Sequence, residues 1–227
     1  MLSRPVALTL GLLLLFTSLT QARERGLYVG GSLGGTDYNV TEAGFDDPPG
    51  DDSPGSIVPG SGSFDHNDRG WSLAVGYKLG RYFSVEGGWT DLGQVRFRGK
   101  TTGQGGLFEC PGGGVADPCD LQVTSETDGV YLIGVGILPL GKFGLLGTLG
   151  LYARRSDFIV QDGSPTDFTG NTHSTETVYG AGVEYRFDRG PTVRIRWEKY
   201  TDIVPIFNTA DVDYYSAGLI YRFGQDR

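Results

Sequence analysis

Eight segments of the chain alternate apolar side chains with polar or small ones, and this period of two residues restricts the fold more than any other feature. Successive side chains of a β-strand point to opposite faces of the sheet, so alternation is typical of a strand between two environments. The segments are 26–35, 70–79, 82–92, 127–138, 142–154, 174–187, 191–200 and 211–223. Together with 38 glycines and 12 tyrosines, they predict a single all-β domain.

The connections between these segments are alternately long and short. The long ones, after the first, third, fifth and seventh segments, are about 36–69, 93–126, 155–173 and 201–210. The short ones contain GR, LPLGK and DRG. This order is typical of an antiparallel up-and-down barrel in an outer membrane. We therefore expect an eight-stranded transmembrane β-barrel over residues 23–227, with four long outer loops and three short periplasmic turns.

The two faces of the segments differ as a membrane barrel requires. In such a barrel the apolar face contacts lipid, whereas the polar or small face lines the lumen. Aromatic side chains gather near the ends of the segments, as in belts at the two membrane surfaces. The expected outer belt is Trp71, Trp89, Tyr131, Tyr179, Trp197 and Tyr215, and the expected inner belt is Tyr77, Phe83, Phe143, Tyr185, Phe187, Tyr221 and Phe223. The segment 127–138 is apolar on both faces, and its lumen side is indicated only by Asp128, Gly134 and Gly136.

Charged side chains on the polar face are expected inside the barrel, where eight strands leave space for little besides side chains. They are Lys78, Glu86, Glu184, Arg186, Arg194, Arg196, Glu198 and Arg222. Because a buried charge without a partner is costly, we expect ion pairs between them. Glu86 is expected near Arg196 at mid-height, with Glu184 near Arg194 one layer lower. We favour fixed plugs that set the register of the strands over a gate, because buried polar groups serve specificity at least as well as transport.

The N-terminus has the regions of a secretory signal peptide. Arg4 precedes the apolar run VALTLGLLLLF, and TSLTQA follows it. The run is shorter than the roughly 20 residues of a membrane-spanning helix, so we expect cleavage after Ala22 rather than an anchor helix. The signal peptide is thus residues 1–22, and the mature chain is exported.

Three short motifs, GLYVGGSLGG, VRIRWEKY and SAGLIYRF, resemble those of the OmpA-type eight-stranded outer-membrane β-barrels, which include OmpX. The resemblance covers Gly26 to Phe223 and implies a monomer among the lipids of a Gram-negative outer membrane. It also implies that the barrel-assembly machinery recognises the closing strand through Tyr221 and Phe223. We expect no peptidoglycan-binding periplasmic domain.

Two further features lie in the long loops. Cys110 and Cys119 flank PGGGVADP in the second loop, and nearby cysteines of an exported protein form a disulfide more often than a metal site. The first loop is acidic, with Asp46, Asp47, Asp51 and Asp52. The spacing of these residues does not match a calcium loop, so we expect no metal and no cofactor.

Charge and histidine content narrow the function. The chain has 19 basic and 27 acidic residues, and this acidic balance argues against nucleic acid as a partner. HSTE places His173 beside Ser174 and Glu176, but neighbouring residues of a strand face opposite sides, so we expect no enzyme; the other histidine, His66, lies in the first loop. Three classes remain: a structural or surface-interaction barrel whose loops contact an unknown extracellular ligand, a narrow passive pore, and a lipid A-modifying enzyme. We expect the first.

Overall fold

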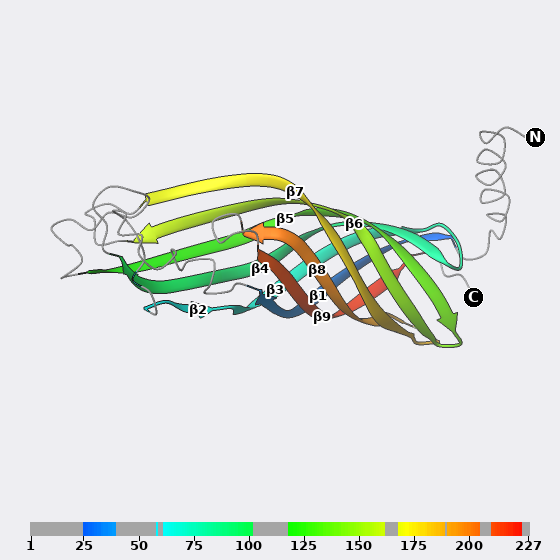
Figure 1. Cartoon of the computed structure of the whole chain (residues 1–227). Helices are drawn as coiled ribbons and strands as arrows, with labels where there is room; N and C mark the ends of the chain where they lie inside the picture. Colours follow the sequence, from blue (N-terminus) through cyan, green and yellow to red (C-terminus); the bar gives the residue numbers. More distant parts are fainter. Residues whose placement is uncertain are drawn as a thin grey trace, which may run out of the picture.

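The computed structural model describes residues 25–39, 58, 61–101, 118–161, 168–188, 190–204 and 210–223. Its strands are β1 (Gly26–Tyr38), β2 (Ser63–Asp65), β3 (Asn67–Lys78), β4 (Phe83–Thr101), β5 (Cys119–Leu140), β6 (Phe143–Gln161), β7 (Phe168–Arg186), β8 (Thr192–Val204) and β9 (Ala210–Arg222). Neighbours pair antiparallel in the order β4-β3-β1-β9-β8-β7-β6-β5, and β4 pairs again with β5 (Figure 1). The predicted eight-stranded antiparallel barrel is confirmed.

Four neighbouring strands are longer than a membrane requires. β4, β6 and β7 have 19 residues each and β5 has 22, whereas a transmembrane strand needs about 9–11. Their outer ends continue past the rest of the barrel as an open sheet (Figure 1). We call this part the outer sheet. It consists of residues 94–101, 119–126, 157–161 and 168–177, and β2 pairs with β4 at its side.

The sequence analysis assigned most of the outer sheet to loops, and this was wrong. The alternation continues there with the opposite polarity, because the outer face now contacts water instead of lipid. Within the outer sheet, Val95, Phe97 and Val123 face inward and are buried, whereas Arg98 and Lys100 face outward and are exposed. A strand that keeps its period but exchanges its two faces no longer matches the membrane pattern.

Within the membrane, the predicted faces hold on every long strand except β5. Leu73, Leu149 and Tyr215 are 56%, 64% and 56% exposed on the outside of the barrel. Glu86 and Arg196 are buried inside it. The apolar surface therefore contacts lipid, and the polar side chains fill the lumen.

β5 has the opposite orientation to the one predicted. Tyr131 and Ile133 point into the barrel and are buried, while Leu132 is 62% exposed. Asp128, Gly134 and Gly136 lie on the outward face, so they do not mark the lumen and Tyr131 is not part of the outer belt. Pairing with β4 sets this orientation, because it places Val130 beside the lipid-facing Trp89. Asp128 is tolerated outside because its Oδ2 accepts a hydrogen bond from Trp89 Nε1 at 3.1 Å.

The predicted short turns close the opposite end of the barrel. Gly141, in the turn between β5 and β6, has φ 68°, a conformation that glycine adopts without strain. Lys142 Nζ lies 2.6 Å from Asp188 Oδ2, and this hydrogen bond raises the pKa of Lys142. Among the described residues, no helix is long and apolar enough to cross a membrane.

Candidate functional site

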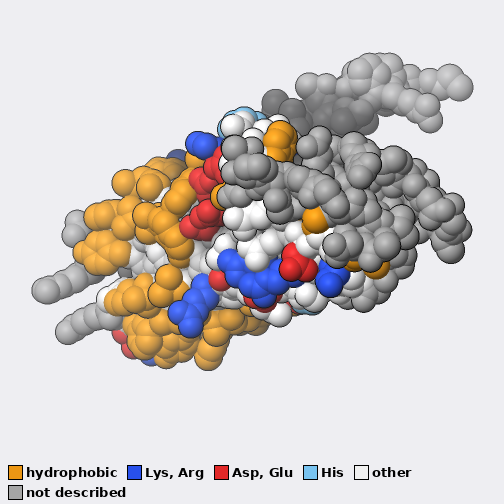
Figure 2. All heavy atoms as spheres, turned by 90° about the vertical axis from the view of Figure 1, so that its left-hand side faces the viewer, with side chains coloured by type: hydrophobic (Ala, Val, Ile, Leu, Met, Phe, Trp, Pro, Cys, Tyr) orange, Lys and Arg blue, Asp and Glu red, His pale blue; other side chains and the backbone are white. Residues whose placement is uncertain are grey.

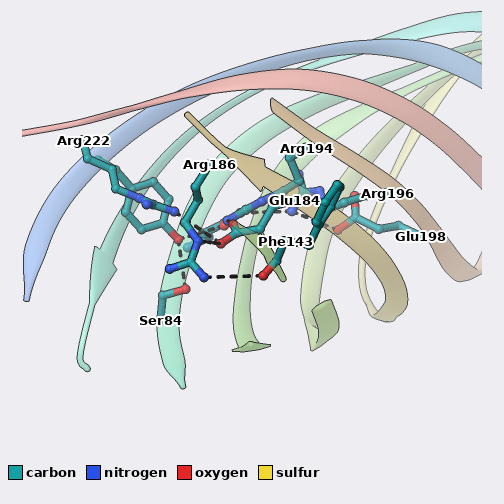
Figure 3. Close-up of polar contacts among 10 residues, drawn as sticks. Ser84, Phe143, Glu184, Arg186, Arg194, Arg196, Glu198 and Arg222 are labelled. Atoms are coloured by element: carbon teal, nitrogen blue, oxygen red, sulfur yellow. Dashed lines mark hydrogen bonds and ion pairs between the residues drawn. The ribbon is translucent and has the colours of Figure 1, made fainter. Parts of the chain in front are cut away.

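A network of buried ion pairs lies in the periplasmic half of the lumen (Figure 3), together with buried apolar side chains of β5 and β6 such as Ile133, Ile137 and Leu146. Its centre is Glu86 of β4, which reaches two arginines of β8. Arg196 Nη1 lies 3.0 Å from Glu86 Oε2, and Arg194 Nη1 contacts Glu86 Oε1. Tyr28 of β1 donates a hydrogen bond to the same carboxylate at 2.8 Å. Glu86 therefore holds β1, β4 and β8 together across the barrel.

The other two carboxylates extend this network in both directions along the barrel axis. Glu184 lies toward the periplasmic end, 3.2 Å from Arg194 Nη2 and 3.4 Å from Arg222 Nη2. Glu198 lies on the outer side, 3.3 Å from Arg196 Nη1. Arg194 and Arg196 each bridge two carboxylates, so the cluster is a continuous chain of alternating charges.

The structure brings together both pairs named from the sequence, Glu86 with Arg196 and Glu184 with Arg194. Two further members of the expected set lie at the periplasmic end. Arg186 Nη2 donates to the carbonyl of Gly141 at 3.1 Å, and Lys78 is buried at the end of β3. Sequence reasoning missed the hydrogen bond from Tyr28 to Glu86, although Tyr28 lies on the lumen parity of β1.

Small residues on β1, β3 and β9 leave a cavity of about 20 Å³ beside the ion pairs. Glu86, Arg194 and Arg196 border it together with Ser72 and Ser216. A space of this size holds about one water molecule. It is too small to form a channel through the cluster.

Aromatic and aliphatic side chains fill the outer half of the lumen. The hydrophobic cluster there includes Tyr38, Leu92, Val95, Phe97, Leu121, Val123, Tyr152, Val160, Val178, Tyr200, Ile203, Val212 and Tyr214. Two of its buried tyrosine hydroxyls donate to backbone carbonyls: Tyr38 to that of Leu92 at 3.1 Å, and Tyr152 to that of Thr90 at 3.3 Å. Sequence reasoning missed this core because most of it belongs to strand ends assigned to loops.

The outer aromatic belt is held by carboxylates. Trp197 Nε1 donates to Asp213 Oδ1 at 2.8 Å, as Trp89 does to Asp128. The rings of Trp71 and Trp89 meet edge to face, with centroids 4.6 Å apart. At the periplasmic end, Tyr221 and Phe223 are exposed on the outside, with ring centroids 5.1 Å apart.

The residues considered for catalysis do not form a site. His173 faces outward and Ser174 inward, as their neighbouring positions require. Glu176 lies 3.9 Å from Arg154 Nε, and His66 stacks on Phe64. In the described ranges, no three His, Cys, Asp or Glu side chains are arranged to hold a metal ion.

Several expectations fall outside the described residues. They concern the signal peptide at residues 1–22, the acidic residues Asp46, Asp47, Asp51 and Asp52, and Cys110. Cys119 is the first residue of β5, so the disulfide between the two cysteines stays a prediction.

Comparison with solved structures finds other outer-membrane proteins. The attachment invasion locus protein Ail of Yersinia pestis is 16% identical, with 87% of this chain and 99% of Ail covered and a TM-score of 0.48. Neisserial surface protein A is 13% identical, with 87% and 97% covered and a TM-score of 0.49. OprG of Pseudomonas aeruginosa is 15% identical, with 87% and 96% covered and a TM-score of 0.46.

Comparison with curated protein sequences finds no significant match. A family model, by contrast, matches residues 7–223 and is described as the outer membrane protein beta-barrel domain. It spans the whole described barrel, including the ion-pair network and the outer sheet. The chain therefore belongs to the outer membrane protein beta-barrel domain family and resides in the outer membrane of a Gram-negative bacterium.

Proposed function

We propose that this protein is a surface-interaction barrel: the membrane part anchors it, and the outer sheet contacts an extracellular ligand. The observation that carries this proposal is the filled lumen. Ion pairs and apolar side chains of β5 and β6 occupy its periplasmic half, and a hydrophobic core occupies its outer half. A barrel closed at both levels is suited to holding a surface element in place rather than to passing solutes.

The outer sheet has the surface of a water-exposed contact element. Its outward side chains include Arg98, Lys100, Gln122 and Glu126, and its buried inward side chains include the apolar Val95, Phe97 and Val123. Figure 2 shows the charged side chains gathered apart from the large hydrophobic surface that faces lipid. At about 3.3 Å per residue, the additional eight residues of β4 extend roughly 25 Å along the strand. The contact surface thus includes the outer sheet as well as the loops that it carries.

A passive pore is the alternative that this arrangement disfavours. Ions would have to separate the Glu86 and Arg196 side chains and also cross the layer formed by Tyr152 and Tyr200. The first step exposes buried charges, and the second requires a polar path through an apolar core. We therefore propose that the barrel is a monomeric anchor surrounded by outer-membrane lipid.

The test compares the full chain with a variant that lacks the outer sheet. Gln94, Glu126, Asp157 and Asn171 are cross-strand neighbours in one row, so each hairpin can be closed there with an Asn-Gly turn. Bacteria displaying the full chain should adhere to cultured epithelial cells, and the shortened variant should insert in equal amount but not adhere. Equal adhesion by both would refute the proposal, as would steady ion conductance of the full chain in planar bilayers.

A further inference from the structure

The ion-pair network of the lumen contains more cations than carboxylates. Its arginines are Arg186, Arg194, Arg196 and Arg222, and its carboxylates are Glu86, Glu184 and Glu198. Arg196 balances Glu198 on the outer side, and Arg194 balances Glu86 at the centre. Within the described part of this network, Glu184 is then the carboxylate that faces both Arg186 and Arg222. The surplus positive charge therefore lies at the periplasmic end.

Arg186 and Arg222 approach the same oxygen of Glu184. Arg186 Nε lies 3.8 Å from Glu184 Oε1, and Arg222 Nη2 lies 3.4 Å from it. Both separations are longer than the roughly 2.7–2.9 Å of a charge-assisted hydrogen bond. Arg186 Nε is buried and makes no hydrogen bond to the described residues. Two like charges thus lie beside one carboxylate oxygen that satisfies neither of them fully.

The two arginines reach the surface at the periplasmic end, whereas the carboxylate does not. The side chains of Arg186 and Arg222 are 21% and 14% exposed, and that of Glu184 is 0% exposed. Figure 3 shows the two guanidinium groups close to Glu184. Asp188, in the adjacent turn, is paired with Lys142 Nζ at 2.6 Å. A ligand from the periplasm therefore meets a positive surface, although the whole chain has a net charge of −8.

We propose that Arg186 and Arg222 bind a phosphate group at the periplasmic mouth of the lumen. A guanidinium offers its N–H donors in a planar fork that matches phosphate oxygens. Arg186 Nη2 donates to the carbonyl of Gly141 at 3.1 Å, which orients the side chain and leaves its other donors for a ligand. Phosphate has enough oxygens to accept from both forks, and its charge balances the surplus of the network. The site is independent of the contact surface proposed above, which lies at the other end of the barrel.

The phosphate group has two potential sources. One is free inorganic phosphate in the periplasm, which meets the exposed parts of both arginines directly. The other is the headgroup of a phospholipid in the inner leaflet of the outer membrane. Arg222 lies between Tyr221 and Phe223, which are exposed on the lipid-facing side of the barrel. The lipid surface is therefore close to the site, and the two sources share the same recognition chemistry.

The test uses the full barrel in dodecyl maltoside, a detergent without phosphate. Isothermal titration calorimetry at low ionic strength measures the affinity for inorganic phosphate and for dihexanoyl phosphatidylglycerol, a soluble lipid probe. We expect saturable binding at one site. If the headgroup is the ligand, the lipid binds at least about tenfold more tightly than inorganic phosphate, and if free phosphate is the ligand the order is reversed.

The variants separate the site from the net charge of the chain. Arg186→Gln combined with Arg222→Gln should weaken binding at least about tenfold, because hydrogen bonds from two charged groups are lost. Glu184 keeps Arg194 at 3.2 Å in this variant, so the unboiled protein should retain the gel mobility of the folded barrel. Arg98→Gln combined with Arg155→Gln is the matched control. It removes the same charge from exposed positions on the outer side and should leave the affinity unchanged.

Three outcomes would overturn the inference. The first is the absence of saturable binding of either probe to the unmodified barrel, a measurement that needs no variant and decides the question even if the glutamine variant misfolds. The second is equal affinity of the unmodified barrel and the folded Arg186→Gln, Arg222→Gln variant. The third is an equal loss in the Arg98→Gln, Arg155→Gln control, which would assign the affinity to net charge rather than to the mouth of the lumen.

Discussion

Replacing Arg196 by methionine tests which cations balance the buried carboxylates of the lumen. Arg196 is the ion-pair partner of both Glu86 and Glu198, at 3.0 and 3.3 Å. After the replacement Glu86 still has Arg194, whereas Glu198 has no other ion pair within the described residues. Glu198 is 2% exposed, so its carboxylate would remain buried without a counter-charge.

The expected loss in the free energy of unfolding follows from that one carboxylate without a counter-charge. Breaking a buried pair by removing one partner costs roughly 3–5 kcal/mol, because it leaves an uncompensated charge in the interior. Arg196→Met should therefore lower the free energy of unfolding by about 3–5 kcal/mol. Adding Glu198→Gln should restore most of the loss, because it removes the uncompensated charge while Glu86 and Glu184 stay balanced by Arg194 and Arg222.

A second double variant separates this account from the simple pair expected from the sequence. Arg196→Met with Glu86→Gln removes the two residues that were expected to balance each other. This double variant leaves Glu198 without a counter-charge and also takes a partner from Arg194. Little of the lost free energy of unfolding should therefore be recovered. Of the two double variants, the one with Glu198→Gln should thus have the higher free energy of unfolding. The simple pair expected from the sequence predicts the opposite, with more recovery in the variant that carries Glu86→Gln.

The assay is urea unfolding in lipid vesicles, followed by tryptophan fluorescence. Arg98→Met is the matched control, because it removes the same group from the exposed outer sheet and should change stability by less than about 0.5 kcal/mol. Equal recovery by Glu86→Gln and Glu198→Gln would refute the assignment of the cost to Glu198. Losses below about 0.5 kcal/mol for Arg196→Met would mean that the side chain contacts water.

Three further predictions concern other parts of the chain. Cys110 and Cys119 should resist thiol labelling until the protein is reduced, and labelling of the unreduced protein would exclude the disulfide. Truncation after Ile220 should leave protease-sensitive chain in the periplasm, because it removes the end of the closing strand; normal membrane insertion would contradict this. Asp128→Leu should lower the free energy of unfolding in urea by about 1 kcal/mol, because Trp89 loses its hydrogen bond. An unchanged free energy of unfolding would mean that water replaces the carboxylate as the acceptor.

The transmembrane architecture could be predicted from the sequence because lipid imposes a rule on each residue of a strand. Outside the barrel the side chains must be apolar, and inside a narrow lumen charges must find partners. Strands such as β8, with Arg194 and Arg196 on one face and Ile195 on the other, show this rule directly. Their pairing across the lumen followed from level and parity alone, which explains why Glu86 was placed near Arg196 and Glu184 near Arg194.

The orientation of β5 could not be predicted in the same way. Both faces of this strand are apolar, so its own residues satisfy the rule in either orientation. The choice depends on its neighbours: pairing with β4 places Val130 beside the lipid-facing Trp89 and Tyr131 in the lumen. Asp128 misled the sequence analysis because a carboxylate is accepted outside when an indole N–H at the membrane surface binds it.

What the sequence by itself determined was the eight-stranded barrel, its lipid-facing surface and the charged residues of its lumen, since each depends on a local period and on the polarity of single positions. The tertiary structure decided how far the strands extend and which cation balances the charge of Glu198. These features depend on which strands meet. The same alternation separates lumen from lipid on the periplasmic side of the outer aromatic belt, and it separates the hydrophobic core from water on the outer side. Among the described residues, the β7–β8 pairing ends at Val178 and Tyr200 while the β6–β7 pairing continues to Phe168, a relation between strands that neither of them encodes.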